Sequence, residues 1–395
     1  MKENAHHLHQ KPNCCKYWYR RHNFSSSSIA DRTSMPDTAI SAQRLNTLCE
    51  NISPLDPRLL HAGQEHVDSL AKPLGSLGRL EEIASRLFAI NRGIRPLHVA
   101  PARLFTVAGD HGVYAEGVGC APQEVTRLQV LNFLRGGGGI NCICAACGAE
   151  LLVVDAGVAG DEFDDHPRLI KHRIAPGTAN IATGPAMTEE QCLDALLFGA
   201  SLAEQAKNDG CAALAIGEMG IANTTPSSAL YCAWLGLPPE KVVGPGAGIP
   251  HVGLAGKATV IRKSLDVNAE AVDSGSPLKI LAALGGFEIA VMAGIILGAG
   301  AQRLPVAIDG FIATASFVAA RAMAPQSAGY CFLSHTSAEP GHMLVMERLG
   351  EKPYLNLDMR LGEATGAAIA LVLLRSAAIM FNNMDTFASL GVTAG

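Results

Sequence analysis

Two glutamates and one lysine stand where they could do chemistry on a phosphorylated substrate. A buried carboxylate can remove a proton, and an ammonium group can bind phosphate oxygens. The three residues are Glu218, Lys257 and Glu363, in the segments GEMGIANTT (217–225), GPGAGIPHVGLAGK (244–257) and LDMRLGEATGAAIA (357–370). The role of each residue depends on the local structure that its segment forms.

The segment 217–225 follows an apolar run and should open a helix. A glycine such as Gly220 lets the backbone approach a ligand, while Asn223 and Thr224 supply hydrogen-bond donors. The first N–H groups of a helix have no partner within it and bind phosphate or carboxylate groups well. The alternative is a capped strand-to-helix turn. Glu218 favours the anion site, because a carboxylate at a strand end is costly to bury.

The glycine-rich segment 244–257 matches neither common phosphate-binding fingerprint. Walker A requires a Gly-Lys-Ser/Thr ending, but here His251 and Ala258 stand at the wrong positions, and G-x-G-x-x-G is also missing. An ATPase or a dinucleotide enzyme is therefore disfavoured. A loop that offers backbone N–H groups, with Gly246, and the Lys257 ammonium to one phosphate remains open, beside a plain flexible loop.

Glu363 stands between a glycine and a long apolar segment that predicts a helix. The helix dipole favours a carboxylate in the first turn, so capping is one interpretation. If that turn faces a crevice, partial burial would raise the pKa of Glu363 and suit it to act as a general base. The spacing alone does not choose between them.

No metal or cofactor is expected. The segment SHTSAEPGH (334–342) holds two histidines and a glutamate, but it lacks the H-E-x-x-H spacing, and we expect Pro340 to prevent a regular helix there. The segment CICAAC (142–147) has no second cysteine pair at zinc-ribbon spacing, so it predicts a close-packed helix.

Short apolar runs alternate with Ala-rich segments after about residue 102, which indicates βαβ units and a parallel sheet. Acidic or imidazole groups recur where these runs end, and ligands of open α/β sheets bind beside the carboxyl ends of the strands. The expected strands are 104–108, 151–154, 212–216, 305–308 and 331–333, and the residues at their ends are Asp110, His111, Asp155, Glu218, Asp309 and His335. Residues 38–98 show helical spacing instead.

The composition is that of a globular protein, with 48% hydrophobic and 17% charged residues among 395. The net charge of −5, without a basic cluster in the main body, argues against a nucleic-acid partner. The apolar runs 280–300 and 364–381 contain Glu288 and Arg375, so we expect buried helices and no membrane span. Eleven cysteines, mostly within apolar runs, indicate a reduced, cytoplasmic compartment.

The first 34 residues differ from the rest because they are basic and rich in serine. Three interpretations remain open for them. In order of preference, these are sequence upstream of a true start at Met35, a disordered tail, and an organelle transit peptide.

Taken in order, several segments resemble the nicotinate-nucleotide:dimethylbenzimidazole phosphoribosyltransferase family, which makes the lower-ligand nucleotide of cobalamin. The resemblance runs from about residue 50 to the C-terminus. Its segments are KPLGSLGRLE (72–81), AGDHGV (108–113), VTRLQVLNFLRGGGGIN (125–141), GEMGIANTT (217–225), SAEPGH (337–342), LGEATGA (361–367) and NNMDTF (382–387). It implies a homodimer. It also implies a reaction in which a benzimidazole nitrogen attacks the anomeric carbon of nicotinate mononucleotide and expels nicotinate.

The resemblance also implies an α/β fold, with a Rossmann-like parallel sheet flanked by helices and a smaller helical domain from N- and C-terminal segments. We expect residues 1–34 to be an extension and 35–100 to contribute helices to the small domain. Residues 101–350 would form the nucleotide-binding domain, and 351–395 would supply the catalytic loop and complete the small domain.

The same resemblance implies roles for single residues. Glu363 corresponds to the general base, and Glu218 to a second carboxylate that contacts the base or the ribose. Positions implied at the nucleotide are Gly220, Lys257, Asp309 and Ser337, to which the segments above add Asn223, Thr224 and Gly246. Leu361 would line the flat aromatic pocket, and no metal would be required.

The chain also departs from the family. It has Cys120 and Leu128 where the family often has Ser and Gln in the base pocket, and Ala222 where the family usually has Gly. A less polar pocket leaves the acceptor open. Transfer to another azole, a purine or a phenolic base is one alternative, and a non-catalytic nucleotide-binding protein is another.

Overall fold

The computed structural model describes residues 38–119, 121–244, 246 and 251–391. Within it, residues from Thr38 onward form one compact unit. The interpretations of residues 1–34 and the position of Cys120 lie outside the described residues.

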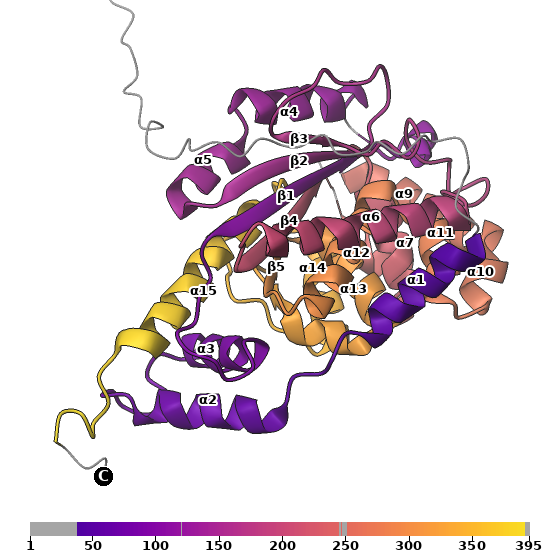
Figure 1. Cartoon of the computed structure of the whole chain (residues 1–395). Coiled ribbons are helices and arrows are strands. Elements are labelled where there is room, and N and C mark those ends of the chain that lie inside the picture. The colour runs from indigo at the N-terminus through magenta and orange to yellow at the C-terminus, as the bar shows by residue number, and fades with distance from the viewer. Residues whose placement is uncertain (1–37, 120, 245, 247–250, 392–395) are drawn as a thin grey trace, which may run out of the picture. The chain divides into compact units, whose positions relative to one another are not determined.

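A six-stranded, all-parallel sheet forms the centre of this unit, in the order β3-β2-β1-β4-β5-β6 (Figure 1). The strands are β1 (Ala102–Gly109), β2 (Glu150–Gly157), β3 (Leu169–Lys171), β4 (Ala213–Met219), β5 (Val306–Ile308) and β6 (Cys331–Leu333). The predicted α/β class with a parallel sheet is confirmed. All five expected strands are present, but β3 was missed because three residues at a sheet edge carry no periodic signal.

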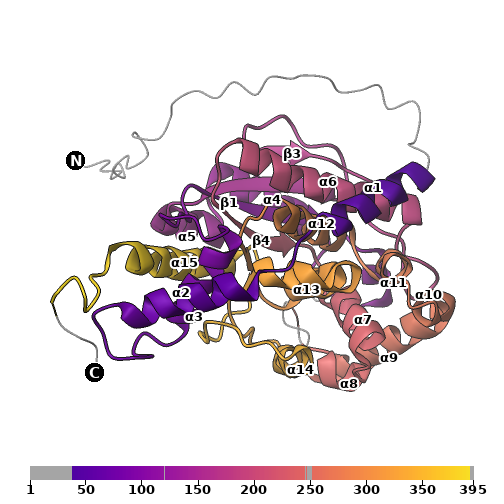
Figure 2. The ribbon, with the colours of Figure 1, turned by 60° about the horizontal axis from the view of Figure 1, so that its bottom comes forward.

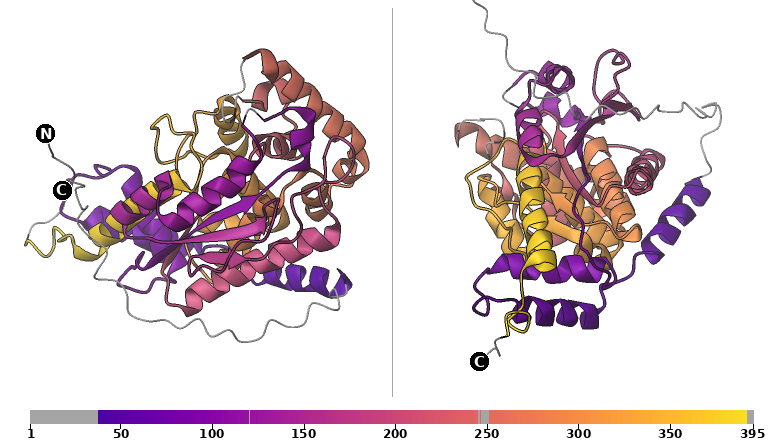
Figure 3. Two further views of the ribbon diagram at one scale, coloured as in Figure 1. Left: turned by 90° about the horizontal axis from the view of Figure 1, so that it is seen from above. Right: turned by 60° about the vertical axis from the view of Figure 1, so that its left-hand side comes forward.

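Helices cover both faces of the sheet. On one side, α12 (Phe287–Ala301) packs against β1, β2 and β4 and against α6 (Glu189–Asn208). On the other, α4 (Glu124–Arg135), α5 (Gly139–Cys147) and α15 (Thr365–Asn383) contact the strands (Figure 3). This arrangement buries the sheet on both faces, as its nearly continuous apolar strands require.

The apolar run 280–300 is buried, as expected, but it forms two helices rather than one. The helix α11 (Pro277–Leu284) ends at Gly285, and α12 begins after Gly286, whose extended backbone separates them. By length and composition, Glu124–Cys147 and Thr365–Asn383 could each cross a membrane. Thr365–Asn383 is α15 and is mostly buried, whereas Glu124–Cys147 is partly buried and is divided into α4 and α5; both segments pack against strands of the sheet.

The N-terminal helices meet the C-terminal end of the chain. In Figure 2, α2 (Pro57–Ser69) and α3 (Arg79–Ile90) lie beside α15. The connection is made through the backbone, because the N–H of Ala71 donates to the carbonyl of Asp385 at 2.8 Å, and the N–H of Phe387 donates to the carbonyl of Ser69 at 3.1 Å. The first helix, α1 (Thr38–Glu50), instead packs against α6.

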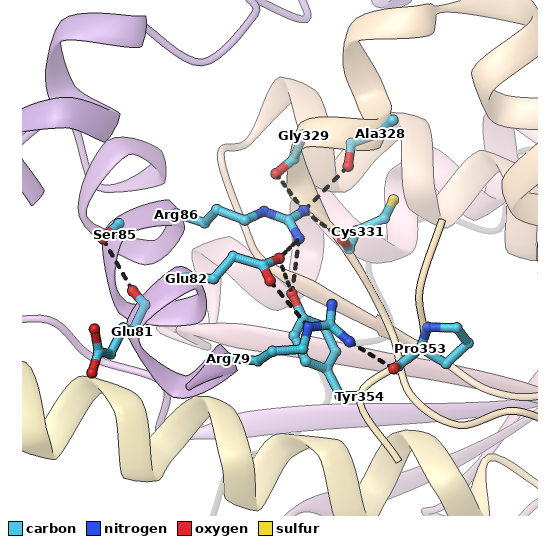
Figure 4. A network of polar contacts seen from close by, with 10 residues as sticks. All are labelled: Arg79, Glu81, Glu82, Ser85, Arg86, Ala328, Gly329, Cys331, Pro353 and Tyr354. Carbon is cyan, nitrogen blue, oxygen red and sulfur yellow. Dashed lines mark hydrogen bonds and ion pairs between the residues drawn. The ribbon is translucent and has the colours of Figure 1, made fainter. Parts of the chain in front are cut away.

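The motif KPLGSLGRLE anchors α3 to the rest of the molecule. A buried ion pair joins Lys72 to Glu81 at 2.8 Å. Arg79 donates to the carbonyl of Pro353 at 2.6 Å, and Arg86, two turns later in α3, donates to the carbonyl of Cys331 at 2.6 Å (Figure 4). The described contacts of this motif are therefore structural.

The other elements connect the strands and pack around the sheet. They are η1 (Gly112–Glu116), α7 (Thr224–Leu235), α8 (Pro239–Val242), α9 (His251–Val267), α10 (Ala269–Asp273), α13 (Phe311–Met323), η2 (Pro325–Tyr330) and α14 (Pro340–Leu349). As predicted, CICAAC (142–147) is helical, within α5. Pro340 begins α14, so the expectation that it excludes a helix was wrong: the first helical turn tolerates proline because its N–H needs no helical partner.

Candidate active site

Ionisable side chains lie together at the carboxyl edge of the sheet. The sequence predicted such residues at the ends of the strands. The members are Asp110, His111, Asp155, Glu218, Asp309 and His335, all of which are buried. Asp155 takes the simpler role of a turn former, because it accepts hydrogen bonds from the N–H groups of Gly157 and Val158. Glu218 and Asp309 lie beside Glu363, as the following contacts show.

The segment GEMGIANTT joins β4 to α7, so the predicted strand-to-helix transition is present. Asn223 donates a hydrogen bond from Nδ2 to Oε2 of Glu218, which uses the amide to hold the carboxyl group. Burial raises the pKa of Glu218 to about 8, against the Asn223 hydrogen bond, and the nearby carboxylates of Glu288, Asp309 and Glu363 raise it further. At neutral pH this side chain is therefore mostly protonated and can donate a hydrogen bond.

Two positions in this segment have backbone requirements that suit glycine. A Cβ on Gly220 would lie 2.5 Å from the carbonyl oxygen of Gly109, so only glycine fits there. Ala222, where the resembling family usually has glycine, has a φ of 74°. That left-handed conformation explains the preference for glycine, because a Cβ is strained in it.

Lys257 lies in α9 and reaches back to the start of α7. Its Nζ contacts Oγ1 of Thr224 at 2.5 Å and the carbonyl of Gly244 at 3.1 Å, although the side chain is almost fully buried. A Cβ on Gly246 would lie 3.1 Å from Oγ1 of Thr224 and 3.7 Å from Nζ of Lys257. Three of the residues expected at the nucleotide, Thr224, Gly246 and Lys257, are thus in one cluster.

Ser337 borders this cluster through its neighbour Glu339. The Oγ of Ser337 accepts the N–H of Glu339 at 3.3 Å, and the Ser337 N–H donates to Nδ1 of His342 at 2.8 Å. Burial raises the pKa of Glu339, and Lys257 opposes this shift by attraction. The segment SAEPGH therefore lies near the lysine, with its serine held by its own turn.

Glu363 is carried by a turn rather than by the first turn of a helix. Gly362, Glu363 and Ala364 have φ values of 80°, 62° and 74°, and α15 begins at Thr365. The expectation that Glu363 lies in the first turn of this helix was therefore wrong. Its Oε2 accepts the N–H of Ile140 at 3.2 Å, so the carboxylate sits at the N-terminus of α5 instead.

The environment of Glu363 favours the protonated form of its carboxyl group. The residue is 3% exposed, and this burial raises its pKa, with the N–H of Ile140 opposing and the carboxylate of Asp309 adding to the shift. A carboxylate with a raised pKa accepts a proton more readily near neutral pH.

Asp309 lies beside this turn and binds backbone. Its Oδ2 accepts the N–H of Ala364 at 3.0 Å, and its Oδ1 accepts the N–H groups of Gly366 at 2.9 Å and Ala367 at 3.3 Å. Burial raises the pKa of Asp309 to about 7, against these hydrogen bonds. In this structure the carboxylate caps α15 and fixes the residues that follow Glu363.

The three residues expected in the base pocket are not all brought together. Leu361 is 57% exposed and lies against Gly139, where a Cβ would meet its Cδ2 at 2.9 Å and Oε2 of Glu363 at 3.3 Å. Leu128 is also 57% exposed and lies in α4, about 200° around the helix from the buried Thr126. Cys120 is not among the described residues.

Two further buried polar residues, Glu288 and Thr106, had no predicted role at the site. His111 and Glu288 form a fully buried pair, with Nε2 and Oε1 2.7 Å apart. In the sequence, Glu288 is marked only as a lone carboxylate in an apolar run, which argues against a membrane span. Thr106, in the middle of β1, donates from Oγ1 to the carbonyl of Glu363 at 2.9 Å, and nothing in its local sequence marks it.

The described residues include no group of three or more His, Cys, Asp or Glu side chains that could hold a metal ion. The groups that this site offers a substrate are carboxylates, backbone N–H groups and the ammonium of Lys257. Such a set suits an anionic substrate with a developing positive charge at its reacting centre.

Comparison with known proteins identifies the family. The model of a phosphoribosyltransferase family matches residues 52–392. The chain belongs to this family. That range includes the site residues described above, so the family match covers the carboxyl edge of the sheet as well as the flanking helices.

Similar proteins cover nearly the whole described unit. The nicotinate-nucleotide–dimethylbenzimidazole phosphoribosyltransferase of Nitratidesulfovibrio vulgaris (strain DP4) is 55% identical over 349 residues, which are 88% of this chain and 98% of that protein. The protein of the same name from Solidesulfovibrio magneticus is 55% identical over 351 residues, 89% and 99% of the two chains. The crystal structure of CobT from Thermus thermophilus superposes with a TM-score of 0.80 at 44% identity, covering 86% of this chain and 100% of the other.

Proposed function

We propose that this chain transfers the phosphoribosyl group of nicotinate mononucleotide to 5,6-dimethylbenzimidazole, giving α-ribazole 5'-phosphate and nicotinate for cobalamin biosynthesis. The observation that carries this proposal is the 55% identity to enzymes of that name along 98% of their length. The buried carboxylates and lysine at one sheet edge supply the groups that such a reaction needs.

In the reaction, a ring nitrogen of the benzimidazole forms a bond to the anomeric carbon of the ribose. The bond from that carbon to the pyridinium nitrogen breaks, and its electron pair stays on nicotinate. The other ring nitrogen loses its proton to Glu363, so the product is neutral at the base. Attack from the face opposite nicotinate inverts the anomeric carbon, which yields the α product.

Glu363 suits the role of base for two reasons. It is buried, so its pKa is raised, and the N–H of Ile140 holds one carboxylate oxygen in place. Its charge also favours the cationic centre that develops as the pyridinium bond breaks. Glu218, with a pKa of about 8, would contact the ribose or the base as a protonated donor.

The phosphate would bind near Lys257, where the start of α7 and the glycine-rich loop meet. An ammonium complements a phosphate dianion, and the hydroxyl of Thr224 at the start of α7 lies beside it. The residues that we assign to the nucleotide are Gly220, Asn223, Thr224, Gly246, Lys257, Asp309 and Ser337. Among them, Asp309 would act indirectly, because it binds backbone N–H groups of the residues that follow Glu363.

The acceptor pocket would include Leu361, which lies beside Glu363 next to Gly139. Leu128 lies on the outer face of α4, so the apolar wall for a hydrophobic benzimidazole would come from Leu361. We therefore expect activity with 5,6-dimethylbenzimidazole and propose a panel of other azoles, purines and phenols to rank acceptors.

We further propose that the enzyme works as a cytoplasmic homodimer in which α2 and α3, with the C-terminal end of α15, form a small helical domain. Val372 and Ile379 on α15 are apolar and exposed, which supports the proposal that a second copy of the chain covers this surface. The eight described cysteines are free thiols, which fits a reducing compartment. Light scattering should give a particle of twice 41.3 kDa.

The decisive experiment incubates the purified protein with nicotinate mononucleotide, with and without 5,6-dimethylbenzimidazole. Chromatography and mass spectrometry follow nicotinate and the nucleotide product. Release of nicotinate that depends on the base, together with α-ribazole phosphate, is the expected result. No release with this base or with any of the panel would favour a non-catalytic nucleotide-binding protein.

A further inference from the structure

We propose that Thr106 is a positioning residue for the catalytic base: its buried hydroxyl holds the strained turn that carries Glu363. This inference rests on the proposed function, because Glu363 must act as the base for its position to matter. The hydroxyl donates to the carbonyl oxygen of Glu363 at 2.9 Å, between segments that are far apart in the sequence.

The turn that carries Glu363 has an unfavourable backbone conformation. Gly362, Glu363 and Ala364 all have positive φ, and only the first of them is a glycine. Residues with a Cβ avoid this region, and they persist in it only where surrounding contacts fix them. The contacts that fix this turn therefore decide where the carboxylate points.

Hydrogen bonds hold the turn from three directions. The N–H of Glu363 donates to the carbonyl of Glu218 at 3.0 Å. Asp309 accepts the N–H groups of residues that follow Glu363. Thr106 binds the Glu363 carbonyl, so the peptide groups on both sides of the Glu363 Cα are fixed.

Close packing brings the turn within reach of β1. Thr106 pairs in register with Gly217 of β4, and a Cβ on Gly217 would lie 2.3 Å from the N atom of Ala364. The absence of a side chain at Gly217 thus lets the turn rest on the sheet, beside Thr106. In β1 the neighbours of this threonine are apolar, and the residue itself is completely buried.

Burying the hydroxyl of Thr106 costs free energy that an apolar side chain of the same shape would avoid. A buried hydroxyl without a hydrogen-bond partner costs free energy, and valine would fill the same volume in a strand without that cost. The partner it finds is the carbonyl of the proposed base. Since catalysis is sensitive to small displacements of the reacting groups, loss of this bond should lower turnover more than binding.

The test compares Thr106→Val, which removes the hydroxyl at constant volume, with Thr106→Ser, which keeps it. We expect Thr106→Val to lower kcat about 10-fold to 100-fold, with the KM for nicotinate mononucleotide within about twofold of wild type. Thr106→Ser should restore kcat to within about threefold. In the Glu363→Gln background, Thr106→Val should cause no further loss, because the residue acts through Glu363.

Ser327→Ala serves as the matched control, since it removes another buried hydroxyl, in η2 just before β6 and away from the carboxyl edge. It should leave kcat unchanged. If Thr106→Val does not fold, Thr106→Cys takes its place, because a thiol is a weak donor. Equal kcat for wild type and a folded Thr106→Val or Thr106→Cys variant would overturn the proposal. A loss of kcat in Thr106→Ser as large as that in Thr106→Val would overturn it as well.

A second readout does not depend on activity. Amide hydrogen exchange at residues 362–364 should be at least about tenfold faster in Thr106→Val than in wild type, and unchanged in Ser327→Ala. Unchanged exchange in Thr106→Val would contradict the proposed role of the hydroxyl. If the wild-type protein releases no nicotinate, the proposed function fails, whereas the exchange rates still report on the turn.

Discussion

The backbone N–H of Glu363 donates a hydrogen bond to the backbone carbonyl of Glu218 at 3.0 Å. The two glutamates of the site are therefore joined through their main chains, although they come from distant segments. One carboxyl group is held by Asn223, and the other by the N–H of Ile140. This connection fixes a proposed proton acceptor next to a carboxyl group whose pKa burial raises to about 8.

Replacing Glu363 by glutamine should remove proton abstraction while keeping the shape of the site. We expect Glu363→Gln to lower kcat by about 10²-fold to 10⁴-fold, with little change in the affinity for nicotinate mononucleotide. Steady-state kinetics and calorimetric titration of the nucleotide would measure the two effects. A variant with near-normal turnover would exclude Glu363 as the base.

Loss of the ammonium at Lys257 should weaken nucleotide binding as well as catalysis. We expect Lys257→Ala to lower the affinity for nicotinate mononucleotide by about 10-fold to 100-fold, the size of a lost hydrogen bond to a charged group. The matched control is Lys263→Ala on the same helix, whose exposed side chain pairs with Glu116. If both variants bind the nucleotide like wild type, the phosphate lies elsewhere.

The raised pKa of Glu218 predicts how stability changes with pH. The folded protein binds this proton up to about pH 8, whereas the unfolded chain releases it at about pH 4.3, so the native state loses stability as pH rises between these values. Glu218→Gln cannot ionise. It should therefore be more stable than wild type by on the order of a few kcal/mol at about pH 8, with no such gain at about pH 4.

Urea denaturation at several pH values would measure this difference for Glu218→Gln. The exposed Glu204 of α6 provides the control, because Glu204→Gln should change stability equally at all these pH values. A Glu218→Gln variant whose stability differs from wild type by a constant amount across this pH range would contradict the raised pKa.

Gly366 has no room for a side chain. A Cβ there would lie 2.0 Å from Nδ1 of His335 and 3.0 Å from Oδ1 of Asp309, so Gly366→Ala must displace the cap of α15. We expect a loss of about 1–3 kcal/mol in the free energy of unfolding and reduced turnover. At Gly184 a Cβ would meet nothing within 4 Å, so Gly184→Ala should change neither quantity. Equal stability of the two variants would disprove the close contact.

Local patterns in the sequence determined most of the sheet and predicted the ionisable residues that meet at its carboxyl edge. The apolar runs predicted the positions of β1, β2, β4, β5 and β6, and the ionisable residues at their ends predicted the edge where they meet. These features depend on neighbours in the chain: a run of apolar residues fits a strand buried on both faces, and parallel strands place their carboxyl ends together.

Only the tertiary structure decided how the groups are held. It placed Glu363 in a strained turn before α15, made Asp309 the cap of that helix, and turned the hydroxyl of Thr106 towards the carbonyl of Glu363. It also placed Leu128 on the outer face of α4. Each of these outcomes depends on contacts between segments far apart in the sequence, and burial, which sets the pKa of each carboxyl group, exists only once those segments have packed.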